Sequence, residues 1–144
     1  MDLPFKRLDQ GAVLPERAHP GDAGLDLRSA ADVVVEPGER AMVPTGLAVA
    51  IPEGHAGLVL PRSGLASRRG LTLANAPGLI DAGYRGEVIC AVVNLDRSQP
   101  VQIARGDRIA QLVIVAVPDV RSVLVDELPD TPRGVGGFGS TGTQ

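Results

Sequence analysis

The sequence predicts an all-β domain of the jelly-roll, sandwich or barrel type. Short apolar runs alternate with turn-forming residues along most of the 144-residue chain, and 18 glycines and 12 prolines supply those turns. Only one segment, of barely two turns, has a helical pattern. One domain is expected, since a chain of about 150 residues buries roughly 68–70% of the surface that its unfolded form exposes.

The expected strands follow one another from Val33 to Val125. Turn signals separate them, for example Glu-Pro-Gly-Glu at 36–39 and Pro-Glu-Gly-His at 52–55. Some runs alternate apolar with polar residues, and others are continuously apolar, as in strands covered on both faces. The helical segment is 64–69. The predicted strands are 33–35, 47–51, 57–60, 71–74, 87–94, 101–104, 108–117 and 120–125.

The chain divides into a β domain (1–128) and a C-terminal arm (129–144) that is glycine-rich, polar and expected to be mobile. A fold with many strands has many sheet edges, and exposed edges must be covered. Because apolar runs continue up to Val125, we expect neighbouring subunits to close some of those edges.

Composition excludes several classes of protein. Aromatic residues make up only 2% of the chain, so the core must be aliphatic, and Tyr84 and Phe138, which lie in polar or glycine-rich stretches, are candidates for roles other than packing. The net charge of −3 argues against nucleic-acid binding, because an acidic chain gains no counterion release from a phosphate backbone. No signal peptide opens the chain and no apolar run approaches the ~18–20 residues of a membrane span, so a cytoplasmic protein is expected.

The sole cysteine, Cys90, lies in an apolar run and is expected to be a buried, inert thiol rather than a nucleophile. His19 and His55 are far apart and lack partners at metal-ligand spacing, so no zinc-type site is expected.

Two early segments combine glycine with polar residues. In Pro-Gly-Asp-Ala-Gly-Leu-Asp-Leu (20–27), the Asp26 carboxylate could hold a hydrated cation or make an Asx turn. In Pro-Arg-Ser-Gly-Leu-Ala (61–66), Ser63 could cap the helix that follows. Together with Arg62 and the backbone N–H groups of the helix start, it would then form an anion site; plain capping of a structural turn is the alternative.

The segment 75–87 contains the most unusual pattern. Its Pro-Gly pair at 77–78 lies between two apolar pieces and predicts a β-hairpin. Asp81 ends an apolar strand, where a carboxylate partly screened from water can carry a raised pKa and take a proton from an attacking water. Tyr84, beside a glycine, can lie flat against a sugar or base. The alternative is a structural ion pair between Asp81 and Arg85.

Two later segments carry the remaining candidates. Gln111 interrupts an apolar strand, so its amide is either a structural bracket or a ligand contact. The segment 134–139 matches GxGxxG, but no parallel strand precedes it and no helix can follow, which excludes a dinucleotide site; the Gly-Lys-Ser/Thr of a P-loop is also missing. Arg133 and Phe138 in this strip suit a lid over a phosphorylated ligand, with a disordered tail as the alternative.

Taken in order, these five segments resemble the five motifs of the trimeric dUTPases across nearly the whole chain. The resemblance implies a jelly-roll homotrimer in which each active site draws on all three subunits. It also implies hydrolysis of dUTP to dUMP and pyrophosphate, which keeps uracil out of DNA and supplies dUMP for thymidylate synthesis.

The resemblance assigns the reaction to Asp81, which would activate water for in-line attack on the α-phosphate. Asn75 and the neighbouring backbone at Leu79 and Ile80 would read the uracil edge. Tyr84 would stack on the deoxyribose and block a 2′-hydroxyl group.

The same resemblance assigns the triphosphate. Arg133 would reach the γ-phosphate, and Phe138, followed by Gly139 and Ser140 in the arm, would stack on the uracil. Mg²⁺ would be held chiefly by the triphosphate, with Asp26 near its water shell. The residues implied to hold phosphates are Arg62, Ser63, Gly64 and Gln111.

Two alternatives use the same scaffold. A dCTP deaminase would need a glutamate over the pyrimidine amino group in an arginine- and serine-rich segment, whereas here Leu65 and Ala66 follow that segment. A non-catalytic trimeric nucleotide-binding module is the other, against which the presence of Asp81 and of the arm argues. Ile89 is apolar where relatives can carry a polar or basic residue, so no ligand role is expected for it.

Overall fold

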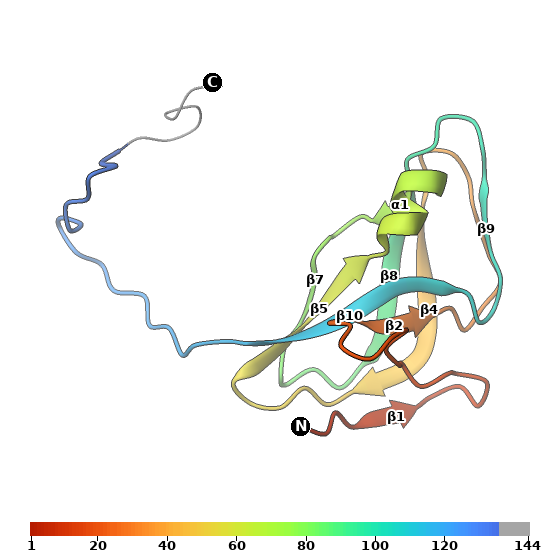
Figure 1. The fold of residues 1–144 in the computed structure, drawn as a ribbon, viewed down its shortest axis with the longest axis horizontal. Coiled ribbons are helices and arrows are strands. Elements are labelled where there is room, and N and C mark those ends of the chain that lie inside the picture. The colour runs from red at the N-terminus through yellow and green to blue at the C-terminus, as the bar shows by residue number, and fades with distance from the viewer. Residues whose placement is uncertain (136–144) are drawn as a thin grey trace.

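The computed structural model describes residues 1–135 and consists of two four-stranded antiparallel sheets, a two-stranded ribbon and a short helix (Figure 1). The first sheet has the order β1-β4-β8-β6, the second β2-β10-β5-β7, and β3 pairs with β9. The predicted all-β, jelly-roll-like fold is therefore confirmed. The elements are β1 (Phe5–Arg7), β2 (Leu25–Arg28), β3 (Val33–Val35), β4 (Arg40–Val49), β5 (His55–Pro61), α1 (Ser63–Arg69), β6 (Leu71–Leu73), β7 (Gly78–Ile80), β8 (Glu87–Asn94), β9 (Val101–Ile103) and β10 (Arg108–Ala116).

Aliphatic side chains from both four-stranded sheets form the core, as the scarcity of aromatic residues requires. On β8 every second side chain is buried, which places Cys90 inside with 1% of its surface exposed. The buried amide of Asn94, at the end of β8, donates to the carbonyls of Val35 (2.9 Å) and Gln99 (2.8 Å). This polar group is thus satisfied, as a buried amide must be.

The predicted hairpin around the Pro-Gly pair at 77–78 is wrong. The apolar piece before it, β6, pairs with β8 in the first sheet, and the piece after it, β7, pairs with β5 in the second. The segment 74–77, with a cis Ala76–Pro77 bond, therefore carries the chain from one sheet to the other. Turn chemistry alone does not reveal this, because the partner strand is chosen by packing and not by the turn.

The predicted strand at 120–125 is also wrong. β10 ends at Ala116, and residues 117–135 run away from the sheets without helix or strand (Figure 1). Val120 is 75% exposed and Leu124 is 99% exposed. A run of β-favouring residues becomes a strand only beside a neighbour, and the single chain offers none here.

Helix α1 begins one residue earlier than predicted. Arg62 is its N-cap residue and makes no side-chain cap hydrogen bond, so Ser63 is the first helical residue and the expected serine cap is wrong. The helix ends at Gly70, which adopts the left-handed conformation with φ 65°. No helix in residues 1–135 is long and apolar enough to cross a membrane.

Candidate active site

An open cavity of about 970 Å³ lies where β2, β5 and β10 meet the start of α1. We call it the arginine cavity. Its lining includes candidates from the first, second and fourth sequence segments, which the antiparallel pairing of β10 with both β2 and β5 brings together. Those candidates are Asp26, Arg62, Ser63, Gly64 and Gln111.

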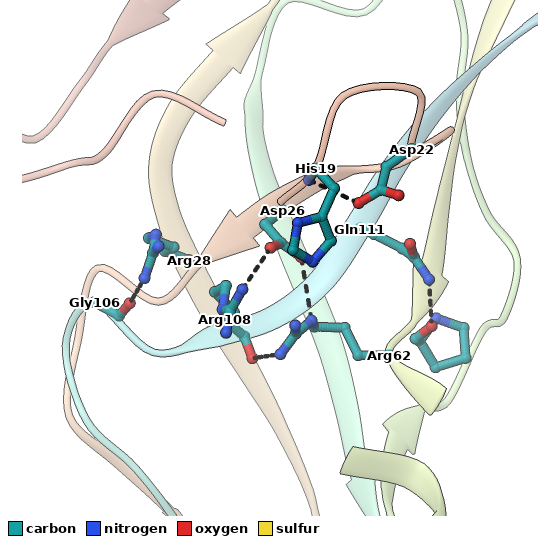
Figure 2. Close-up of polar contacts among 9 residues, drawn as sticks. His19, Asp22, Asp26, Arg28, Arg62, Gly106, Arg108 and Gln111 are labelled. Atoms are coloured by element: carbon teal, nitrogen blue, oxygen red, sulfur yellow. Dashed lines mark hydrogen bonds and ion pairs between the residues drawn. The ribbon is translucent and has the colours of Figure 1, made fainter. Parts of the chain in front are cut away.

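The Asp26 carboxylate holds two guanidinium groups in the arginine cavity. Its Oδ1 lies 3.1 Å from Nε of Arg62, and its Oδ2 lies 3.2 Å from Nη1 of Arg108 (Figure 2). Only 15% of the Asp26 side chain is exposed, so this ion pair is better shielded than a surface pair. One carboxylate thus fixes the direction of two cationic groups toward the same cavity.

The segment comparison by eye missed Arg108. Alternation along a regular strand would place Arg108 and Gln111, three residues apart, on opposite faces. A β-bulge between Arg108 and Ala110 adds one residue, so both Ile109 and Ala110 are buried and the two polar residues share a face. A bulge leaves no clear mark in the sequence; the buried pair Ile-Ala between two polar residues is the only signal.

Gln111 acts as a bracket in this structure. Its Nε2 donates to the carbonyl of Pro61 at 3.1 Å, just before the N-cap of α1. Gly24 makes room for it, because a Cβ at that position would lie 2.4 Å from the amide oxygen of Gln111. The amide therefore positions the start of α1, and it still lines the arginine cavity.

A second cavity, of about 270 Å³, is lined by β7, β8 and the loop between them. We call it the tyrosine cavity. It brings together the predicted nucleoside residues, with Leu79 and Tyr84 exposed at its rim. Ile89, for which no ligand role was expected, also lines it. The predicted residues on its wall are Asn75, Leu79, Ile80 and Tyr84.

Asp81 follows β7 directly and is exposed. It lines neither the arginine cavity nor the tyrosine cavity. The alternative ion pair with Arg85 is not formed: that guanidinium donates to the carbonyls of Ala82 (2.6 Å) and Tyr84 (2.7 Å). Within residues 1–135 the Asp81 carboxylate has no ion-pair partner.

One chain does not join the two cavities. They share no lining residue, and the consecutive β5 residues Val59 and Leu60 line one each. Successive side chains of a strand point to opposite faces, so the cavities lie on opposite sides of β5. The arm contributes Arg133 to the described residues, whereas Phe138, Gly139 and Ser140 lie outside them.

Comparison with known proteins decides the family. The family model for dUTPase matches residues 10–142. This chain belongs to the dUTPase family. It is 60% identical over 138 residues to a deoxyuridine 5′-triphosphate nucleotidohydrolase of Thermobifida fusca (strain YX), covering 96% of this chain and 77% of that relative. A second such relative, from Mycolicibacterium gilvum (strain PYR-GCK), is 59% identical over 145 residues, covering 97% and 94%.

Solved dUTPase structures agree with this member of the family in fold. A dUTPase of Staphylococcus bacteriophage 80alpha with dUpNHpp superposes with a TM-score of 0.90 at 36% identity and covers 98% of each chain. A dUTPase from phage phi11 of S. aureus, whose structure shows the coordination of a structural Mg(II) ion, has a TM-score of 0.84 at 34% identity and covers 90% of this chain. The predicted family is therefore confirmed.

Proposed function

We propose that this chain hydrolyses dUTP to dUMP and pyrophosphate, which keeps uracil out of DNA and supplies dUMP for thymidylate synthesis. The observation that carries the proposal is the presence, in a dUTPase-family chain, of one cavity rich in guanidinium groups and another with an amide and an exposed tyrosine. The first suits a triphosphate and the second a nucleoside.

The arginine cavity has the charge that a triphosphate needs. Such a ligand brings about four negative charges to a protein whose own net charge is −3. Arg62 and Arg108 face the cavity, and a guanidinium group can hold phosphate oxygens through paired donors. Ser63 and Gly64, in the first turn of α1, add a hydroxyl and backbone N–H groups.

The tyrosine cavity has the polar edge that a uracil needs. In the described part of the chain β7 is an edge strand, so one side of its backbone is not used by the sheet. The backbone at Leu79 and Ile80, with the Asn75 amide, would pair with the uracil edge. A cytosine there would leave buried donors or acceptors unpaired, at about 1–3 kcal/mol for each mismatch.

Asp81 is the general base in this proposal. It would accept a proton from a water molecule as the water oxygen attacks the α-phosphorus in line. The bond from the α-phosphorus to the bridging oxygen breaks, so dUMP forms and pyrophosphate leaves. A positioned base contributes about 10²–10⁴-fold, and the remaining acceleration comes from orientation and charge stabilisation.

The described residues fit a magnesium ion that the substrate itself holds. No group of three or more His, Cys, Asp or Glu side chains among residues 1–135 could hold a metal ion. Asp26 is the carboxylate that would face the water shell of a triphosphate-bound Mg²⁺, once the phosphates engage the guanidinium groups it now pairs with. Bound Mg²⁺ would offset the charge of the triphosphate.

The proposal includes a homotrimer with shared active sites. Because the two cavities lie on opposite sides of β5, the tyrosine cavity of one subunit and the arginine cavity of another would make a complete site. The arm would close that site, with Arg133 at the γ-phosphate and Phe138 on the uracil, and Gly139 and Ser140 between closure and phosphate contact.

Replacement of the base tests the chemistry. Asp81→Asn keeps the size and exposure of the side chain but removes its basicity, so we expect kcat to fall by about 10²–10⁴-fold with dUTP affinity retained. Pyrophosphate release with Mg²⁺ and binding by calorimetry measure the two effects. The same assay with dCTP, UTP and dTTP defines the substrate, and ammonia release from dCTP would instead indicate a deaminase. Full turnover in the variant would exclude Asp81 as the base.

A further inference from the structure

The ring of Tyr84 lies folded over the backbone of Gly86. Its hydroxyl donates to the carbonyl of Glu87 at 2.8 Å. A Cβ at Gly86 would lie 2.5 Å from the Tyr84 hydroxyl oxygen, 2.7 Å from Cζ and 3.0 Å from Cε2. The tyrosine can occupy this position only because residue 86 has no side chain.

Backbone conformation does not require a glycine at residue 86. The glycines of this chain with positive φ in the described residues do not include Gly86. The three atoms nearest to an added Cβ all belong to the Tyr84 ring. An alanine would therefore displace the far end of that side chain, which can rotate, and would leave the surrounding backbone in place.

The acceptor of the Tyr84 hydroxyl is itself fixed to the first sheet. The Glu87 carboxylate accepts the backbone N–H of Gly46 at 2.7 Å, within the β-bulge of β4. Next to it, the Thr45 hydroxyl donates to the carbonyl of Val88 at 2.7 Å, and this bond is buried. The Tyr84 hydroxyl thus bonds to a carbonyl that does not move with the loop.

The loop also holds Tyr84 from its backbone. Its N–H donates to the carbonyl of Asp81 at 3.0 Å, and its carbonyl accepts from Arg85 at 2.7 Å. With backbone and hydroxyl both held, the ring has a defined place at the mouth of the tyrosine cavity.

We infer that Gly86 is a specificity-determining positioning residue, which acts through Tyr84 to exclude ribonucleotides. Without a side chain at residue 86, the phenol ring stays folded against Glu87 and fills the space that a 2′-hydroxyl would need. With a side chain there, the ring swings out and that space opens. This inference rests on the proposed function, because it concerns the sugar of the proposed substrate.

The first measurement compares Gly86→Ala with Gly83→Ala. Gly83 lies in the same loop, its added Cβ would meet nothing within 4 Å, and it too is absent from the positive-φ glycines. In Gly86→Ala we expect the ratio of kcat/KM for dUTP to kcat/KM for UTP to fall by at least about tenfold, since steric exclusion of one hydroxyl is lost. In Gly83→Ala the ratio stays as in the unsubstituted protein.

The second measurement needs no activity. The chain has one tyrosine and no tryptophan, so protein labelled with 3-fluorotyrosine gives a ¹⁹F resonance from Tyr84 alone. We expect this resonance to move in Gly86→Ala and to stay in place in Gly83→Ala, with no nucleotide present. An unmoved resonance in folded Gly86→Ala overturns the positioning role.

A third variant covers the case in which Gly86→Ala does not fold. Tyr84→Phe adds no atom and removes only the hydroxyl that bonds to Glu87, so the ratio should fall by a smaller factor; an unchanged ratio overturns the inference. A protein that hydrolyses no dUTP overturns the proposed function and this specificity role together. An active protein whose folded Gly86→Ala variant keeps the full ratio overturns the specificity role alone.

Discussion

Cys90 illustrates how burial alone sets the chemistry of a residue. Burial raises the pKa of its thiol from 9.0 to about 12. The folded state therefore keeps the proton at a pH where the unfolded state has lost it. The contribution of Cys90 to stability is complete below pH 9 and is lost as the pH rises toward 12, at about 1.4 kcal/mol per pH unit. Urea unfolding between pH 7 and about pH 10.5 measures this slope.

The control for this prediction is Cys90→Ala. The cavity that it creates lowers stability at every pH, but the part of the alkaline slope that belongs to the thiol disappears. The remaining groups titrate alike in both proteins. Equal slopes in the two proteins would show that Cys90 does not carry the pH dependence.

At the scale of single residues, the sequence was informative where a polar group interrupts a pattern. Gln111 stood out in an apolar strand and does line the arginine cavity, and Asp26 was found in the same way. Arg108 was not found, because the bulge that turns it toward Asp26 depends on the pairing of β10 with β2. The roles of these residues toward a ligand stay predictions.

Helix α1 depends on Gly70 for its end. Gly70 has φ 65°, and a Cβ there would lie 2.8 Å from the backbone nitrogen of Asp96, which cannot rotate away. Gly70→Ala should therefore lower the free energy of unfolding by more than the roughly 1 kcal/mol that a left-handed alanine costs, to about 2–4 kcal/mol in total. Urea unfolding of both proteins measures the difference.

Gly38→Ala separates the two contributions. Gly38 also has a positive φ, 77°, but an added Cβ would meet nothing within 4 Å. It should cost only the conformational part, about 1 kcal/mol. Equal losses in the two variants would mean that the contact with Asp96 relaxes without cost.

The elements themselves were predictable to different degrees. Alternation along β8 and the continuous apolar run of β10 gave strands close to those observed. Pairing was less predictable: the Pro-Gly pair at 77–78 favours a local hairpin, yet the flanking pieces join different sheets. The run at 120–125 has the composition of a strand, but composition does not supply a neighbouring strand within the chain.

The whole molecule makes a prediction through its two separated cavities. Arg62→Ala damages only the arginine cavity, and Asp81→Asn only the catalytic loop beside the tyrosine cavity. If each active site takes one half from each of two subunits, mixed trimers of these inactive chains contain sites in which both halves are intact. After unfolding and joint refolding at equal amounts, about a quarter of the sites should work.

The control mixes each variant with itself under the same refolding conditions, and neither mixture should gain activity. Sedimentation must show trimers in all three samples. Mixed trimers that remain as inactive as the separate variants would mean that each site is complete within one chain.

The exposed aliphatic residues beyond β10 have a consequence for the life of a newly made chain. Val120, Val123, Leu124 and Leu128 carry apolar surface that water and proteases can reach for as long as a chain is alone. Burial of this surface against other copies would make the half-life of the enzyme rise with its abundance. A scarce chain would be degraded before it found companions, whereas an abundant one would be sheltered, so the supply of the enzyme in the cell would respond to its synthesis more steeply than in proportion.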